Sequence, residues 1–327
     1  MKIYTKILTI ILCLALIAAV FVSCSAVKLD DELEIKISVL NGTTGFGAAK
    51  LISDAKTDKT LLNYNFTVET DASNVTAGLI NGSIDIAALP TNAAATVYNK
   101  TEGKVKIAAV NTLGVLYLMT NGIEINSIAD LEGKTVYSPA QNPAFILEAI
   151  LRANDLIPGE NVTVDTAYAQ PADLRSALVS GQVDIAILPE PMVTIAKSAN
   201  KDLAIALDLT EEWEKVYGIG TLMQGCIVVR TEWAEAHPKE LEEFLKDYKA
   251  SVEFTTVNAK EASQMIVEAG IFAQATVAEK AIPNCNIVYI DGSEMSTALD
   301  IFFAKLYSVK PAAVGGAVPN ADIYLTK

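Results

Sequence analysis

The chain has 327 residues, a formal net charge of −14 and an apolar content of 51%. This length accommodates two medium domains with apolar cores, and the strong negative charge excludes nucleic acid as a natural partner because the two would repel each other. Solubility explains the acidity more simply than an acidic recognition surface does.

The first 24 residues are predicted to be an export signal. Lys2 and Lys6 give it a positive start, and an apolar run over 7–22 follows. This run is shorter than the roughly 20 residues of a membrane span and suits the apolar region of a signal peptide. We assign residues 1–24 to the signal and residues 25–33 to a linker from the anchor.

Ser23-Cys24-Ser25 closes this segment. It resembles a bacterial lipoprotein signal, in which cleavage before the cysteine leaves that residue to carry the lipid. Phe21 departs from the pattern, since such signals usually have Leu three positions before the cysteine. We expect lipidation of Cys24, with simple secretion or an uncleaved anchor as alternatives.

Strands and helices are predicted to alternate after the linker. A strand covers Glu34–Leu40, a Gly/Thr loop covers Asn41–Gly47, a helix starts at Ala48, and a second strand covers Asn65–Thr70.

The segment 79–90 returns as 178–189. In both copies a helix is expected to end at a glycine that accepts left-handed dihedrals, a short apolar strand follows, and a proline opens the next helix. Three pairs keep one separation of 99 residues: Gly82 and Gly181, Asp85 and Asp184, and Pro90 and Pro189. The two aspartates are expected to set turn and strand geometry in preference to contacting a ligand. A period this long indicates repeated domains.

The same order of elements precedes the second copy. It comprises a strand over Thr135–Ser138, a Pro/Asn loop over Pro139–Pro143, a helix over Ala144–Asn154 and a strand over Val162–Thr166. Both halves therefore read βαβαβ, which predicts an α/β fold of two similar lobes with mainly parallel sheets.

Two segments are expected to cross between the lobes and form a hinge. The first follows a strand over Val105–Val110, and the second runs through 220–229 after a strand over Leu203–Leu207. We assign 34–116 and 225–327 to lobe 1, and 117–224 to lobe 2.

The C-terminal part is predicted to be mostly helical. Helical spacing covers Glu232–Phe254, with Pro238 suited to a first turn, then Ala259–Glu268, and then Asp291–Tyr307 after a strand at Cys285–Ile290.

Ligands of such sheets bind beyond the carboxyl ends of strands, near helix N-termini. In lobe 1 this rule selects Thr43, Thr44, Gly45, Phe46, Thr91 and Asn92, and in lobe 2 it selects Gln141, Asn142 and Glu190. Thr112 and Gln224 are expected near the crossings, at the floor of the cleft.

Several of these residues have a structural alternative. The loop 41–47 lacks the Gly-Lys-Ser/Thr ending of a phosphate loop and could be a tight turn. Phe46 could be a core residue instead of a stacking platform. Glu190 could favour a helix dipole instead of binding a cation.

Catalytic chemistry finds little support. His237 is the only histidine and is expected at the surface. Cys13 lies in the signal, and Cys226 and Cys285 could form a disulfide or be small buried apolar residues. We expect no metal site, no cofactor and no enzymatic activity.

The mature chain resembles the substrate-binding proteins of bacterial ABC importers of the nitrate, sulfonate and taurine type, a group that includes binders of thiamine-precursor pyrimidines. The resemblance rests on the Gly-rich loop 41–47, on 133–138, on 146–159, on 184–191, which is the most specific match, and on 315–324.

The resemblance implies a periplasmic binding protein of class II that closes on one small molecule and delivers it to an ABC permease with its ATPase. It implies a monomer at the outer face of the cytoplasmic membrane, held there by the lipid on Cys24. The rivals are an enzyme of the same fold, of the menaquinone or pyrimidine synthesis type, which the export signal disfavours, and a ligand-presenting receptor module.

The loops selected for ligand binding carry no Lys, Arg or His. We therefore rank a neutral or cationic heterocycle, such as a pyrimidine precursor, ahead of a sulfonate, and a sulfonate ahead of nitrate.

Overall fold

The computed structural model describes residues 29–30 and 32–325. The signal, Cys13 and Cys24 lie outside the described residues, as does most of the proposed linker. Within the described part of the chain, no helix combines the length and the apolar character needed to cross a membrane.

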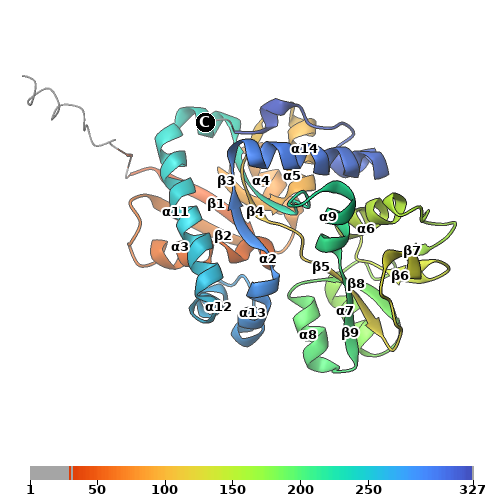
Figure 1. Cartoon of the computed structure of the whole chain (residues 1–327). Helices are drawn as coiled ribbons and strands as arrows, with labels where there is room; N and C mark the ends of the chain where they lie inside the picture. The colour runs from red at the N-terminus through yellow and green to blue at the C-terminus, as the bar shows by residue number, and fades with distance from the viewer. Residues whose placement is uncertain (1–28, 31, 326–327) are drawn as a thin grey trace, which may run out of the picture.

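Two sheets form the centres of two lobes (Figure 1). The six-stranded sheet of lobe 1 has the order β11-β4-β10-β3-β1-β2. Its strands are β1 (Glu34–Leu40), β2 (Asn63–Glu69), β3 (Ile86–Pro90), β4 (Val105–Thr112), β10 (Gly225–Arg230) and β11 (Ile287–Ile290). The five-stranded sheet of lobe 2 has the order β7-β6-β8-β5-β9. Its strands are β5 (Leu116–Asn121), β6 (Thr135–Tyr137), β7 (Thr163–Asp165), β8 (Ile185–Pro189) and β9 (Leu203–Asp208).

The two sheets share one topology. The order β4-β10-β3-β1-β2 in lobe 1 matches β9-β5-β8-β6-β7 in lobe 2. In each sheet one strand runs antiparallel between parallel neighbours, and that strand is the first after a crossing: β5 in lobe 2 and β10 in lobe 1. Each lobe therefore completes its sheet with a strand that arrives from the other lobe. The predicted α/β class with mainly parallel sheets is confirmed.

Helices cover the faces of both sheets. Those of lobe 1 are α2 (Thr43–Phe46), α3 (Ala49–Ala55), α4 (Ala72–Asn81), α5 (Thr91–Thr101), α10 (Thr231–Ala236), α11 (Pro238–Val257), α12 (Ala259–Glu268), α13 (Ala275–Ala281) and α14 (Gly292–Val309). Those of lobe 2 are α6 (Asn142–Ala153), α7 (Pro171–Val179), α8 (Met192–Ala199) and α9 (Leu209–Tyr217).

The structure corrects two predicted elements. The loop 41–47 contains the short helix α2, which begins directly after Gly42. The helix predicted over Glu232–Phe254 is two helices, because α10 ends before His237 and Pro238 starts α11 as its first residue. A proline has no N–H to continue the preceding helix, so the break falls where proline is tolerated.

The repeated segments have the predicted helix, glycine and strand, but Pro189 ends β8 and does not open a helix, because α8 begins at Met192 after Pro191. Gly82 and Gly181 both have positive φ, 81° and 73°, after the helices α4 and α7. Asp85 is buried, accepts a hydrogen bond from the Lys36 N–H and pairs with Arg230, whereas Asp184 is exposed. The geometric role expected of Asp85 is therefore confirmed.

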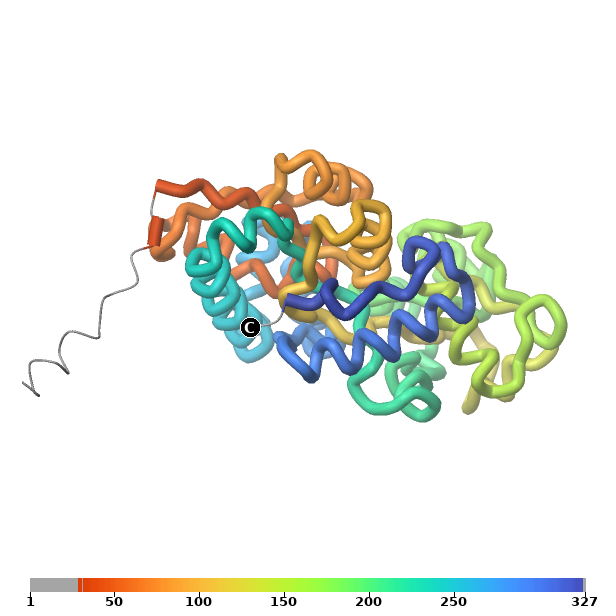
Figure 2. Tube along the Cα trace, turned by 90° about the horizontal axis from the view of Figure 1, so that it is seen from above, coloured from red at the N-terminus to blue at the C-terminus, as the bar shows by residue number. Residues whose placement is uncertain are grey.

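Helix α14 packs on both lobes. It follows β11 of lobe 1, and it also contacts α6 and α9 of lobe 2 (Figure 2). The Phe302 ring lies 5.6 Å from the Trp213 ring, and Lys305 Nζ lies 4.8 Å from the centre of the Tyr217 ring. Phe302 and Trp213 belong to one apolar core that also contains residues of β4 in lobe 1. The lobes are thus joined by packing as well as by the crossings at 113–115 and 218–224.

Candidate functional site

A cleft of about 480 Å³ lies between the lobes. Its walls come from α2 and the end of β1 in lobe 1, and from the starts of α6, α7 and α8 in lobe 2. The residues between β4 and β5, together with Gln224, complete it next to the crossings. The cleft therefore occupies the place predicted for the ligand.

Six of the predicted site residues line the cleft: Thr43, Thr44, Thr112, Asn142, Glu190 and Gln224. Gln224 Oε1 accepts a hydrogen bond from the Val115 N–H at 2.7 Å, which fixes the amide beside the first crossing. Thr112 Oγ1 donates to Asn111 Oδ1. The Oδ1 atom of Asn142 is buried and has no hydrogen-bond partner among the described residues, so it is an acceptor that a ligand N–H could use.

The other predicted residues do not line the cleft. Phe46 is fully buried in the lobe 1 core, so the core alternative is correct for this side chain. Gly45 is buried beneath the cleft wall, where a Cβ atom would lie 2.2 Å from the Leu40 carbonyl oxygen. Thr91 is buried and its hydroxyl donates to the Met223 carbonyl oxygen.

Asn92 and Gln141 also lie outside the lining. Asn92 follows Thr91 on α5, and Gln141 is an exposed residue with positive φ that precedes α6. Both residues stand at a helix start, as the prediction requires. A position at a helix start does not by itself determine whether the side chain faces the cleft.

Phe272 lines the cleft and was missed by the sequence analysis. It lies between α12 and α13, and the Gly42 N–H donates to the neighbouring Ile271 carbonyl oxygen, which ties this loop to the start of α2. The Phe46 ring packs edge-on against the Phe272 ring, with centres 6.1 Å apart. The aromatic surface in the cleft is therefore Phe272, with Phe46 behind it. No sequence signal linked this loop to the site.

Gln170 and Pro171 line the cleft as well. Asp71 and Ala72, at the start of α4 in lobe 1, precede them by the same 99 residues as the repeat. The residues of the two pairs differ, so the sequence repeat does not reach them, but Ala72 and Pro171 are the first residues of α4 and α7 and both line the cleft.

Glu190 is the only ionisable side chain among the described residues that line the cleft. It follows β8, is 3% exposed, and is joined to Pro191 by a cis peptide bond. Its carboxylate accepts hydrogen bonds from the Thr194 N–H and hydroxyl, at 3.2 and 3.0 Å. Burial raises the pKa of Glu190, whereas hydrogen bonding from Thr194 and from the Asn284 side chain acts in the opposite direction.

The lobes meet directly at the cleft. Thr43 Oγ1 of lobe 1 donates to the Glu190 carbonyl oxygen of lobe 2 at 2.9 Å. The Tyr117 hydroxyl of lobe 2 donates to the Asn284 carbonyl oxygen of lobe 1 at 3.0 Å. We call this arrangement, with hydrogen bonds between the two lobes, the closed arrangement.

Helix N-termini surround the cleft and carry partial positive charge, which favours an anion. Prolines occupy several of these starts: Pro90 precedes α5, Pro143 is the second residue of α6, Pro171 the first of α7, and Pro191 precedes α8. Because proline has no N–H, these positions cannot donate to an anion. The cleft therefore holds an anion less well than its helix starts alone would indicate.

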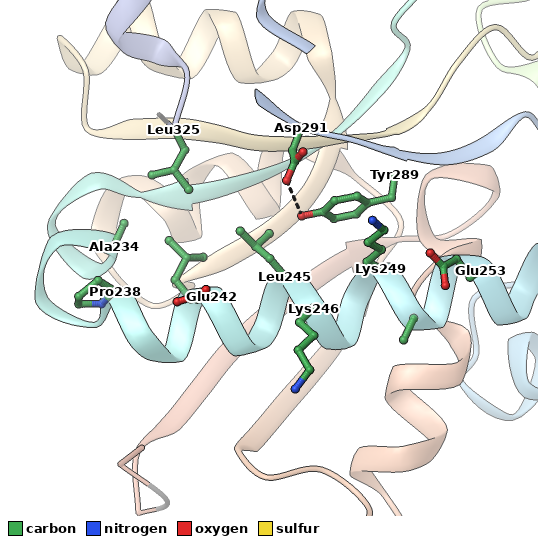
Figure 3. Close-up of a pocket in the computed structure, with 12 residues that line it drawn as sticks. Ala234, Pro238, Glu242, Leu245, Lys246, Lys249, Glu253, Tyr289, Asp291 and Leu325 are labelled. Atoms are coloured by element: carbon green, nitrogen blue, oxygen red, sulfur yellow. Dashed lines mark hydrogen bonds between the residues drawn. The ribbon is translucent and has the colours of Figure 1, made fainter. Parts of the chain in front are cut away.

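A larger groove of about 790 Å³ lies on the outer face of lobe 1 (Figure 3). Its walls are α11, β11 and nearby residues, and the Tyr289 hydroxyl there is 3.3 Å from Asp291 Oδ2. Lobe 2 contributes nothing to this groove. Because the cleft combines both lobes and matches the predicted loops, we take the smaller cavity as the candidate site.

Cys226, Cys285 and His237 do not line the cleft. In the part of the chain that the structure describes, no group of three His, Cys, Asp or Glu residues is placed to hold a metal ion. Cys226 and Cys285 are free and buried, in agreement with the apolar alternative, and burial raises the pKa of both thiols. His237 lies between α10 and α11, with its ring against Trp233.

Comparisons with known proteins identify a matching family and solved structures with the same fold. The family profile described as NMT1/THI5 like matches residues 62–262. A solved ABC transporter protein from Parabacteroides distasonis is 26% identical, with a TM-score of 0.75 over 90% of this chain and 99% of that one. A search of curated protein sequences found no match.

Two further structures share the fold at lower identity. The periplasmic aliphatic sulphonate binding protein SsuA from Escherichia coli is 14% identical, with a TM-score of 0.71 over 90% of this chain and 92% of that one. The periplasmic nitrate-binding protein NrtA from Synechocystis PCC 6803 is 12% identical, with a TM-score of 0.60 over 89% of this chain and 83% of that one.

Proposed function

This chain belongs to the NMT1/THI5-like family, and from that premise we propose that it is the extracytoplasmic substrate-binding component of an ABC importer. It captures one small molecule between its lobes and delivers it to a permease. The observation that carries the proposal is the cleft, which takes its walls from both lobes and lies beside two crossings. A ligand that contacts both walls stabilises the closed arrangement by its additional contacts there. The resemblance noted in the sequence is confirmed at the level of family and fold.

Anchoring and assembly are proposed from the sequence and its resemblance. We propose that Cys24 carries the lipid, that the protein is held at the outer face of the cytoplasmic membrane, and that it works as a monomer with 34–116 and 225–327 as lobe 1 and 117–224 as lobe 2.

The ligand is proposed to be a neutral or cationic heterocycle, such as a pyrimidine precursor. The buried Glu190 carboxylate suits an amino group or a protonated ring nitrogen, and the Asn142 Oδ1 atom suits a second N–H donor. Phe272 offers a flat apolar surface for a ring. No cationic side chain is present among the described lining residues to neutralise an anion.

A sulfonate is the second candidate. It is supported by the helix starts around the cleft and by the fold shared with sulphonate-binding proteins. It is ranked lower because prolines remove N–H donors there and because Glu190 would repel it.

An enzyme of the same fold is disfavoured. The structural relatives compared above are binding or transport proteins, and the cleft presents one carboxylate without a partner base or nucleophile among its described residues.

A thermal-shift screen of the purified protein tests the proposal. Aminomethylpyrimidines, sulfonates, taurine, nitrate and aromatic acids are compared, and a ligand at 100 times its Kd should stabilise the folded state by about 2.7 kcal/mol. A response to pyrimidines is the expected result. A response to sulfonates alone would keep the importer and overturn the ligand ranking, and turnover of a hit would overturn the binding function.

A further inference from the structure

The Glu190 carboxylate is buried where the two lobes meet. It belongs to lobe 2, yet Asn284 of lobe 1 hydrogen bonds with it, and its charge acts on the Cys285 thiol of the same lobe. The Thr43 hydroxyl of lobe 1 binds the carbonyl oxygen of the same residue. Separation of the lobes would remove these neighbours and return water to the carboxylate.

This buried charge has no cationic partner among the described residues. None of their ion pairs includes Glu190, and Lys, Arg and His are missing from the described lining of the cleft. Hydrogen bonds from Thr194 stabilise the carboxylate, but they come from its own lobe and persist when the lobes separate. The Asn284 hydrogen bond comes from lobe 1 and favours the ionised form on closure, but burial outweighs it, since the pKa of Glu190 is raised. Burying an ionised carboxylate without a counter-charge costs free energy. That cost applies to closure, because closure is what removes the water.

We propose that Glu190 is a charge gate for lobe closure: its ionised carboxylate disfavours the closed arrangement of the empty protein, and a ligand that brings positive charge or N–H donors favours it. The part of this inference that concerns the ligand rests on the proposed function. The part that concerns the empty protein does not. A gate of this kind limits how often the permease meets a closed, empty protein.

Protonation of the Glu190 carboxylate should favour closure, as a ligand would. The pKa of Glu190 is raised in the closed arrangement, mainly by burial, so closure favours the protonated form. The closed fraction of the empty protein should therefore rise as pH falls from neutral towards the raised pKa, and fall as pH rises.

Other ionisable groups near Glu190 do not produce this response. Tyr117 and Cys285 face it, and burial raises the pKa of both, so they remain neutral across this range. Asp208 and Glu211, which act on Tyr117, belong to the same lobe as Glu190 and move with it.

The test measures closure without any ligand. Spin labels are placed at Ser73→Cys on α4 and Asp173→Cys on α7, two exposed sites on opposite lobes. Electron–electron double resonance then measures the distance between the lobes. Protein without these two substitutions controls for labelling elsewhere. Wild type, Glu190→Gln and Asp184→Asn are compared at about pH 7.5 and about pH 5.

For wild type we expect a closed fraction that rises at the lower pH. Glu190→Gln should be closed more often at the higher pH and insensitive to pH, with a closed-to-open ratio about tenfold higher for each unit by which closure raises the pKa of Glu190. Asp184→Asn removes an exposed carboxylate of the same repeat and should behave as wild type.

Equal closed fractions and equal pH responses in wild type and Glu190→Gln would overturn the gate. If Glu190→Gln does not fold, the wild-type measurement is sufficient: a closed fraction that stays constant or falls at the lower pH overturns the gate. A failed gate leaves ligand binding intact, whereas a thermal screen without hits rejects the proposed function and leaves this measurement unaffected.

Discussion

The two copies of the repeated segment build the same backbone and use it differently. After β3, Pro90 leads directly into α5, and the buried Thr91 binds the chain near the second crossing through Met223 and Gln224. After β8, two more residues, Glu190 and Pro191, precede α8, and both line the cleft. One copy is hydrogen-bonded to the second crossing, and the other lines the candidate cleft more extensively. A duplicated scaffold thus acquires a site where its copies diverge.

The largest expected difference between the copies concerns their aspartates. Asp85→Ala would leave Arg230 without its nearest carboxylate and the Lys36 N–H without its acceptor, so we expect a loss of about 3 kcal/mol in the free energy of unfolding. Asp184→Ala, at an exposed site, should change stability by less than about 0.5 kcal/mol. Urea unfolding of both variants checks this, and equal losses would show that the buried pair has no special role.

Glu190→Gln should weaken binding of the ligand found in the screen by about 2 kcal/mol, roughly 30-fold, because the charge-assisted hydrogen bond lost in a buried site outweighs the easier closure of the variant. Calorimetry near neutral pH measures the change. Asp184→Asn is the matched control and should bind as wild type does. Unchanged affinity in Glu190→Gln would remove this carboxylate from the ligand contacts.

The glycines should respond alike. Gly82→Ala and Gly181→Ala each place a Cβ atom on a residue with positive φ, which should cost about 1.5 kcal/mol of stability. Thermal unfolding of both variants tests whether the copies share their backbone. A neutral result at either glycine would contradict the common turn.

The smallest effect is expected at the hinge. Thr91→Val removes the hydroxyl bond to the Met223 carbonyl oxygen and should lower stability by about 1 kcal/mol. Ligand affinity should stay within about twofold, because Thr91 does not line the cleft. A large loss of affinity would mean that this junction, like its counterpart, shapes the site.

Local patterns in the sequence predicted the parts of the fold that depend on local chemistry. The left-handed glycines, the short buried strands and the helix that starts at Asn142, two residues before its predicted start, follow from residue type and spacing. The packing of α14 on both lobes depends on contacts between distant segments, such as Phe302 with Trp213, and the sequence contained no pattern for it.

The candidate site was also predicted only in part from the sequence. The rule for strand ends located the cleft and selected Glu190, but it could not tell which residues of each loop face inward. Phe46 and Phe272 illustrate this, since the predicted ring lies in the core and the other ring lines the cleft. Their roles depend on the loop between α12 and α13, which approaches α2 only in the folded chain.

A crystal structure of the protein with its ligand tests the central claim most directly. We expect one small molecule between the lobes, with an N–H group in hydrogen-bond distance of the Glu190 carboxylate and its ring against Phe272. An anion held by helix starts without contact to Glu190, or a ligand in the outer groove between α11 and β11, would contradict the account.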